Sequence, residues 1–234
     1  MTGQTVVATA NVLRDLRSAD ARAALDGILE HRPDLIGLQE WGPKRWRVLR
    51  EHRDYRWRTA LLGGCTVGVR RERYDVLGFH RLLLSRPGFA DKPDRPFGLE
   101  PPRLATLARL HDRVTGRTVV FVDYHLVPGV QWEGEFRTDR PRLVARHRAE
   151  ARRLEVLIAR EQAQGQVVVA VGDSNFSGLR LAGLTSAWDG YADLPATLDD
   201  GRTVDDVFGP GRPVDVQLLH NPSDHRAVIA TRRD

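Results

Sequence analysis

Residues 167–176 read VVVAVGDSNF. The five apolar residues 167–171 are typical of a strand that is buried on both faces. This strand runs directly into Gly172 and then into two polar side chains, Asp173 and Asn175, that a strand does not need. A tight turn alone would also account for Gly-Asp-Ser-Asn. A fully apolar strand that leads into polar side chains nevertheless indicates a functional site at its end.

Polar residues also stand at the ends of other strands that the sequence predicts. Active sites commonly collect residues from several strand ends. Taken singly, each has an ordinary explanation: an asparagine can satisfy a backbone group, a carboxylate can stabilise a helix start, and a histidine can be hydrogen-bonded in the core. The residues are Asn11 in strand 4–12, Glu40 after strand 35–39, His125 in strand 118–126, Asp205 in strand 204–208, and Asp224 and His225 before strand 226–231.

The rest of the chain predicts helices and strands in a mixed order. Apolar spacing predicts a helix with Ser18 as its N-cap and Pro33 beyond its end. Other predicted elements are a helix opened by Pro43, paired strands 55–62 and 65–70 around Gly63-Gly64, a hairpin of 104–110 with 118–126, a helix over 141–163, a strand at 214–219, and long loops at 85–102 and 127–140. Mixed strands with few helices indicate two sheets covered by helices. No linker-like segment divides the chain, so we expect one domain over residues 1–234.

Taken together, six segments resemble the endonuclease/exonuclease/phosphatase superfamily. They occur in the order found in that family and span nearly the whole chain. The resemblance implies an α/β (α+β) fold, a four-layer sandwich in which two mixed β-sheets pack face to face and helices flank them. The segments are Thr9-Ala10-Asn11-Val12-Leu13, residues 33–40 (PDLIGLQE), Asp123-Tyr124-His125-Leu126, Val171-Gly172-Asp173-Ser174-Asn175-Phe176, residues 203–208 (TVDDVF) and Ser223-Asp224-His225.

The sequence departs from the family pattern at two of these segments. Ser174 stands where a bulky residue is common, and Thr-Val-Asp-Asp replaces a more usual Arg-Ile-Asp-Tyr, so that Asp205 fits the family aspartate better than Asp206. The presence of His125 resembles the deoxyribonuclease, phosphatase and sphingomyelinase branches.

Phosphodiester cleavage needs a positioned water, a base, and stabilisation of the phosphoryl oxygens and of the leaving oxygen. Glu40 is the best candidate metal ligand, because a hard carboxylate suits Mg²⁺ or Mn²⁺ and magnesium takes few protein ligands. The resemblance adds Asn11 as an amide that helps to hold the metal or the scissile phosphate. Asp224 is a candidate second metal contact.

The resemblance also implies catalytic roles for five residues. Asp173 would orient or deprotonate the attacking water, and Asn175 would donate to a phosphoryl oxygen in the transition state. His225 would contact the phosphate or act in acid–base catalysis, with Asp205 fixing its tautomer. His125 would bond a phosphate oxygen or protonate the leaving group.

The composition excludes some classes of protein and leaves the substrate open. The chain carries 36 Lys and Arg against 31 Asp and Glu, and 34 of its basic residues are arginine, which suits phosphate contacts. Cys65 is the only cysteine, which excludes an intramolecular disulfide and a multi-cysteine zinc site. No apolar run approaches the ~20 residues of a membrane span, and residues 1–10 lack a signal-peptide pattern. We therefore expect a soluble, cytoplasmic protein and a monomer.

Among substrate classes the sequence favours nucleic acid. The loop 127–140 places Trp132 and Phe136 close to Arg137 and Arg140, and aromatic stacking with guanidinium–phosphate contacts suits nucleic acid. Arg103, near the end of the other loop, is grouped with Arg137 and Arg140 as a residue that flanks the cleft and binds substrate phosphates. The alternative is that the aromatic side chains pack the loop onto the core and the arginines are solvated.

Two other functions stay open. One is a phosphatase or phosphodiesterase of a small or lipid substrate, such as an inositol phosphate or sphingomyelin, with the loop 85–102 as a specificity lid. The sequence shows no apolar finger that would insert in a bilayer, which counts mildly against a lipid substrate. The other is a binding protein that kept the fold without catalysis, which is disfavoured because all the expected polar positions are occupied.

Overall fold

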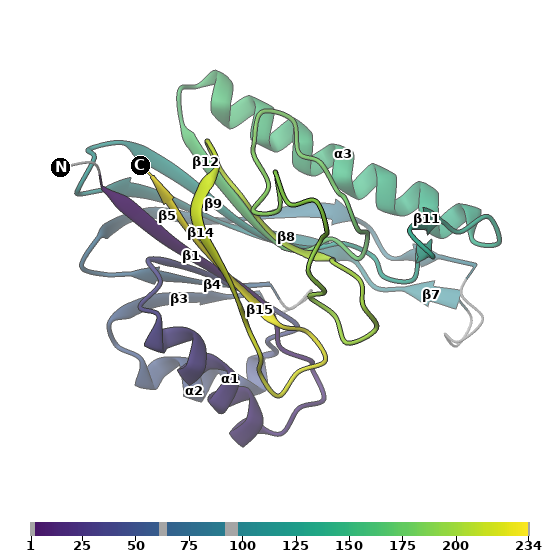
Figure 1. Cartoon of the computed structure of the whole chain (residues 1–234), viewed down its shortest axis with the longest axis horizontal. Coiled ribbons are helices and arrows are strands. Elements are labelled where there is room, and N and C mark those ends of the chain that lie inside the picture. The colour runs from purple at the N-terminus through teal and green to yellow at the C-terminus, as the bar shows by residue number, and fades with distance from the viewer. Residues whose placement is uncertain (1–2, 61–64, 92–97, 234) are drawn as a thin grey trace.

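Two mixed β-sheets face each other at the centre of the molecule, as the computed structural model shows (Figure 1); it describes residues 3–60, 65–91 and 98–233. The first sheet has the order β14 (Pro213–Leu219), β15 (Ala227–Arg233), β1 (Gln4–Asn11), β2 (Leu35–Gln39), β4 (Thr66–Arg70), β3 (Tyr55–Thr59). The second has the order β13 (Asp205–Phe208), β12 (Val167–Asp173), β9 (Thr118–His125), β8 (Arg103–Asp112), β5 (Tyr74–Ser85). Each sheet contains one parallel pair, β1 with β2 and β9 with β12, among antiparallel neighbours.

Helices cover the outer faces of both sheets. Against the first sheet lie α1 (Ser18–Glu30) and α2 (Trp46–Glu51), which follows the short 3₁₀ helix η1 (Pro43–Arg45). Against the second sheet lies α3 (Pro141–Ala163). One apolar cluster fills the space between the sheets, and two others fill the spaces between each sheet and its helices. The predicted four-layer sandwich is therefore confirmed.

Strand alternation decides which side chains reach the space between the sheets. In β1, Val7 joins the cluster between the sheets, whereas Ala8 and Ala10 pack toward α1 and α2. Because side chains alternate along a strand, Asn11 at the end of β1 faces the second sheet. In β12, Val171 belongs to the central cluster, and Asp173 stands two residues further along, so its side chain also faces the space between the sheets.

Gly37 in β2 marks the closest approach of the two sheets near this end. A Cβ atom at Gly37 would lie 2.3 Å from Val171 Cγ2 and 3.0 Å from Asp123 Oδ1, both on the opposite sheet. We expect Gly37→Ala to lower the free energy of unfolding by about 1–3 kcal/mol, as overpacking of a core usually does. Urea unfolding of the variant measures this cost, and an unchanged midpoint would contradict it. Gly27→Ala is the control, because the nearest atom to a Cβ there is 3.5 Å away.

The element boundaries follow the predictions closely, with three differences. The helix at 141–163 is confirmed, but Ser18 is the first residue of α1 and not its N-cap: the cap position is Arg17, with no side-chain cap hydrogen bond. The strand β5 was not predicted. Both predicted loops contain short hairpins, β6 (Gly88–Phe89) with β7 (Leu99–Glu100), and β10 (Gln131–Trp132) with β11 (Glu135–Phe136).

The remaining strand predictions are met where the chain is described. The strands β3 and β4 pair antiparallel as expected, and the Gly63-Gly64 turn between them lies outside the described residues. None of the described helices is both long enough and apolar enough to cross a membrane.

The buried carboxyl group of Asp206 in β13 should make the free energy of unfolding depend on pH. The carboxylate accepts hydrogen bonds from Ser186 Oγ at 2.6 Å and from the backbone N–H groups of Ala187 and Val207. Burial outweighs these bonds and raises the pKa of Asp206 from 3.8 to about 6. A carboxyl whose pKa is higher in the folded state favours folding below its unfolded pKa, and this contribution is lost as pH rises through the folded pKa.

We therefore expect the stability of the wild type, relative to Asp206→Asn, to fall between about pH 4 and pH 6 and to stay level above that. Urea unfolding of both proteins at several pH values measures the difference. A difference that is constant across this range would show that Asp206 keeps its ordinary pKa in the folded state.

Candidate active site

Asp173, at the end of β12, lies at the centre of the polar cluster between the sheets. Its side chain is 1% exposed. Asn11 Nδ2 donates to Asp173 Oδ2 at 2.9 Å, and the backbone N–H of Asn175 donates to Oδ1 at 2.8 Å. Since Asn11 comes from the first sheet and Asp173 from the second, this bond joins the two sheets at the predicted site.

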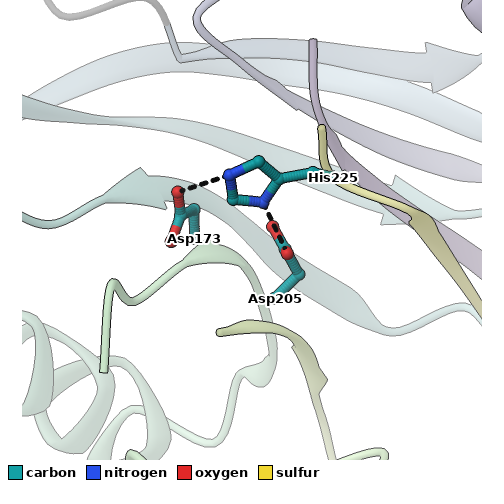
Figure 2. Close-up of side chains that lie close together, drawn as sticks. All are labelled: Asp173, Asp205 and His225. Atoms are coloured by element: carbon teal, nitrogen blue, oxygen red, sulfur yellow. Dashed lines mark hydrogen bonds and ion pairs between the residues drawn. The ribbon is translucent and has the colours of Figure 1, made fainter. Parts of the chain in front are cut away.

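Two histidines approach the same carboxylate oxygen. His125 Nε2 lies 3.5 Å and His225 Nε2 lies 3.8 Å from Asp173 Oδ2. On its other side, His225 Nδ1 donates to Asp205 Oδ2 at 2.8 Å (Figure 2), which fixes the ring and leaves Nε2 directed at Asp173. All four residues are buried. The structure thus brings together Asp173, Asp205, His125 and His225, as the sequence predicted.

The parallel strand pairs explain why residues so distant in sequence meet here. In the β9–β12 register His125 is level with Asp173, and in the β1–β2 register Asn11 is level with Gln39. Parallel strands end at the same edge of a sheet, so these polar residues gather at one edge of the sandwich.

The turn after β12 is held in an unusual backbone conformation. Asn175 has φ of 52°, in the left-handed region that asparagine tolerates better than most residues. Its Nδ2 donates to the carbonyl of Leu126 at 3.1 Å, which ties the turn to the end of β9. In addition, the buried His147 of α3 has Nε2 2.7 Å from the carbonyl oxygen of Ser174. Sequence reasoning missed His147.

Glu40 lies at the same edge and also has a left-handed backbone, with φ of 58°. Its Oε2 accepts the backbone N–H of Arg14 at 3.0 Å. The neighbouring Leu13 N–H donates to Ser223 Oγ at 3.2 Å, and Ser223 lies beside Asp224. The segment after β1 therefore connects Glu40 with the segment that carries Asp224 and His225.

Arg45 is a second supporting residue that the sequence did not reveal. It is buried, and its guanidinium donates to the carbonyl oxygens of Val12, Leu13, Arg14 and Leu16. These bonds shape the loop whose backbone holds Glu40. An arginine inside an apparently exposed helix start, Gly-Pro-Lys-Arg, carries no pattern that distinguishes it from a solvated one.

Two sets of side chains at this edge offer ligand atoms of the kind that a divalent cation needs. Asn11 Oδ1 is buried and has no hydrogen-bond partner in the described part of the chain, and one oxygen of the half-buried Glu40 is not used by Arg14. Both are oxygen donors of the kind that Mg²⁺ prefers. Asp173, Asp205 and His225 also form a candidate metal site, since each offers a ligand atom within 4.8 Å of the others. Metal binding by Glu40, Asn11 and Asp224 stays a prediction.

The protonation states at the site are set by burial and by the neighbouring charges. Burial raises the pKa of Asp173 to about 6. Burial also acts to lower the pKa of His225, but Asp205 and Asp173 outweigh it and raise that pKa to about 10. In contrast, burial and the charge of Arg103 hold the pKa of His125 well below its usual value. Near neutral pH the site combines a cationic His225 with a neutral His125.

The three predicted phosphate-binding arginines lie in different settings. Arg103 is only 8% exposed, with a guanidinium nitrogen 3.8 Å from Glu100. Arg137 pairs with Asp139 at 2.5 Å, and Arg140 Nη1 donates to the carbonyl of Gly129. Their contact with substrate phosphates stays a prediction.

One buried polar pair below the site also escaped sequence reasoning. Gln39 Nε2 donates to Asp123 Oδ1 at 2.6 Å and to Thr9 Oγ1 at 3.0 Å. This pair joins the two sheets directly below the candidate site. Burial holds the pKa of Asp123 well above its usual value. The signal was present, since Gln39 adjoins Glu40 and Asp123 stands two residues before His125.

The sequence model of the Endonuclease/Exonuclease/phosphatase family matches residues 8–225. The chain belongs to this family, as the six motif segments predicted. A comparison with curated proteins gives no significant match to the sequence.

Solved structures show the same fold at low sequence identity. The human Nocturnin catalytic domain with bound sulfate is 19% identical with a TM-score of 0.72, covering 100% of this chain and 96% of that chain. A humanized TDP2 from D. rerio is 16% identical with a TM-score of 0.71, covering 97% and 98%. A mannosyl-6-phosphatase from Bacteroides thetaiotaomicron is 15% identical with a TM-score of 0.67, covering 98% and 99%. At these identities the likeness establishes the fold.

Proposed function

We propose that this protein is a divalent-metal-dependent phosphoesterase that hydrolyses phosphodiester bonds, most favourably those of DNA or RNA. The main observation in favour of this reaction is that Asn11, His125 and His225 all approach the same carboxylate oxygen, Oδ2 of Asp173. That arrangement supports a water held by Asp173 beside a phosphate held by the histidines.

Each side chain has a role that its surroundings support. Asp173 is the group that orients the attacking water and accepts its proton, because it is a buried acceptor at the centre of the cluster. His225, kept protonated by Asp205, donates to a phosphoryl oxygen and neutralises charge there. His125, which is neutral, forms a hydrogen bond with a second phosphate oxygen or protonates the leaving oxygen. Mg²⁺ or Mn²⁺ held by Glu40 and Asn11, with Asp224 nearby, would supply Lewis-acid stabilisation of the phosphoryl charge.

The hairpin β10–β11 supports nucleic acid as the substrate class. Phe136 stacks on Phe176 with ring centroids 4.0 Å apart, and Gln131 Oε1 accepts the N–H of Ser177, so the hairpin is attached to the turn that carries Asn175. Trp132 is 65% exposed, and the Arg137 guanidinium lies 5.9 Å from its ring centroid. Phe136 therefore packs the loop onto the core, while Trp132 offers an open face for base stacking.

A phosphatase or phosphodiesterase of a small or lipid substrate is the second candidate function, and one observation favours it. Phe89 and Leu99 are directly opposite each other on the β6–β7 hairpin and are 72% and 50% exposed. Two neighbouring exposed apolar side chains suit an acyl chain or another apolar substituent.

A side-by-side assay separates these functions. Plasmid DNA, single-stranded DNA and RNA, inositol polyphosphates and sphingomyelin are incubated with Mg²⁺, Mn²⁺ or EDTA, with Asp173→Asn as the inactive control. We expect cleavage of nucleic acid that EDTA and Asp173→Asn abolish. Turnover of inositol phosphates or sphingomyelin without cleavage of nucleic acid would reject the nuclease function and support the second candidate function. No turnover of any of these phosphate esters with either metal would leave only a binding protein.

A further inference from the structure

The solvent face of α3 is strongly basic. The helix has 23 residues and is therefore about 34 Å long. Five exposed arginines of this helix have no ion pair with a carboxylate within 4.0 Å in the described part of the chain: Arg142, Arg148, Arg152, Arg153 and Arg160. Of these, Arg153 also donates from its guanidinium to the carbonyl of Leu84 at 2.6 Å. We call these five residues the α3 arginine face.

The acidic residues of α3 do not balance this charge. Glu150 is fully buried and accepts hydrogen bonds from Ser85 Oγ and from the N–H of Val127, in addition to an ion pair with Arg146. Glu161 is buried and pairs with Arg109 at 2.7 Å. The third carboxylate of the helix, Glu155, is half-buried. The charge that faces solvent is therefore almost entirely positive.

Helix stability does not account for these arginines. Arg142 stands in the first turn, where the helix dipole disfavours a cation; the helix itself has no acidic residue there, and the one carboxylate at this end is that of Asp91, which accepts the backbone N–H groups of Arg142 and Leu143. Arg148 and Arg152 are four residues apart, so two like charges are neighbours on the helix surface and repel each other. Of the five positions, Arg160, in the last turn, is the one that the dipole favours.

The face begins beside the candidate active site. Arg148 lies over the Phe136 ring at 4.6 Å, and Phe136 stacks on Phe176, which follows Asn175. His147, the residue before Arg148, contacts the carbonyl of Ser174. From there α3 extends along the outside of the second sheet (Figure 1), so its arginines form a track that leads away from the site.

We propose that the α3 arginine face binds the phosphate backbone of a nucleic acid strand beyond the phosphate that is cleaved. This inference rests on the proposed nuclease function and adds an extended binding surface to it. Arginines without carboxylate partners suit this role, because each phosphate contact releases counterions and strengthens binding without regard to base sequence.

The test compares two double variants that change the net charge equally. Arg152→Glu with Arg160→Glu reverses two charges of the α3 arginine face. Arg53→Glu with Arg56→Glu reverses two exposed charges on the α2–β3 side of the other sheet and serves as the control. Binding of a labelled 30-nucleotide single strand in EDTA is followed by fluorescence anisotropy over a range of KCl concentrations. Steady-state kinetics with Mg²⁺ use the same strand and bis-p-nitrophenyl phosphate.

We expect the α3 variant to weaken binding about tenfold or more at low salt and to lower the slope of log K against log[KCl] by about 1.4, the value for two lost single-strand contacts. KM for the strand should rise by a similar factor to the loss of binding. The value of kcat and the turnover of bis-p-nitrophenyl phosphate should not change. An equal loss in the control variant, or unchanged binding by the α3 variant, would overturn the proposal.

The outcome is independent of the cleavage assay. A wild-type protein that binds the strand through α3 but does not cut it would refute the nuclease function and leave the binding surface standing. If the wild type and both double variants cut nucleic acid equally well, the nuclease function would stand and the α3 arginine face would be refuted as a binding surface.

Discussion

Asp173→Asn should lower kcat by several orders of magnitude and leave substrate binding nearly intact. The amide has the same shape and keeps one acceptor oxygen for Asn11 Nδ2 or the Asn175 N–H, which both bond the carboxylate now. It cannot accept a proton from water. Loss of a general base alone typically costs ~10²–10⁴ in rate, and loss of the water's orientation adds to that.

The measurement is kcat and KM on whichever phosphodiester the assay identifies, at saturating metal. His225→Ala should be comparably severe, and Asp205→Ala milder, because Asp205 acts through its 2.8 Å bond to His225. Circular dichroism of each variant shows whether the fold is kept. If the Asp173→Asn protein is folded and its kcat is near normal, Asp173 is not the general base and another residue must act in that role.

Glu40→Gln should weaken divalent-ion affinity, with activity partly restored by added metal. The substitution removes the charge but keeps an oxygen that can accept from the Arg14 N–H, the bond that Glu40 makes now. A neutral amide binds Mg²⁺ less well than a carboxylate, so the apparent metal constant should rise. Activity is titrated with Mg²⁺ from micromolar to tens of millimolar for both proteins.

Comparing the two variants in one titration tests how the roles are divided. Excess Mg²⁺ should help Glu40→Gln and do little for Asp173→Asn. If instead excess metal fully rescued Asp173→Asn and left Glu40→Gln inactive, the cation would belong with Asp173, Asp205 and His225, whose ligand atoms also lie within 4.8 Å of one another. Direct Mn²⁺ binding, followed by electron paramagnetic resonance, decides this without turnover.

The sequence identified the residues that converge at the candidate site because they lie in short contiguous motifs at strand ends. Asn11, Asp173 and His225 each stand next to an apolar strand, and the pattern of alternation decides which way they face. The four layers followed from the motif order and the strand–helix pattern, and the helix over 141–163 followed from its apolar periodicity.

What the sequence did not reveal depends on contacts between distant segments. The sequence places Arg103 near the end of a predicted loop, yet it is the first residue of β8, where the pairing with β5 and the packing around it bury its side chain. Arg45 and His147 act on the site through backbone carbonyls of other segments, and no local pattern encodes such bonds. The long strand β5 lacks a clear alternation, because it is an edge strand whose burial varies along its length.

The Asn11–Asp173 hydrogen bond and the Gln39–Asp123 pair place half of the site on each sheet. Partial unfolding that frees either sheet therefore dismantles the site at once. Loss of activity in denaturant should then coincide with the first unfolding transition that separates the two sheets, whether that transition is partial or global. By the same argument the slowest amide hydrogen exchange should occur in β1, β2, β9 and β12, the strands that carry these bonds. The geometry of the candidate site therefore depends on the integrity of the entire sandwich.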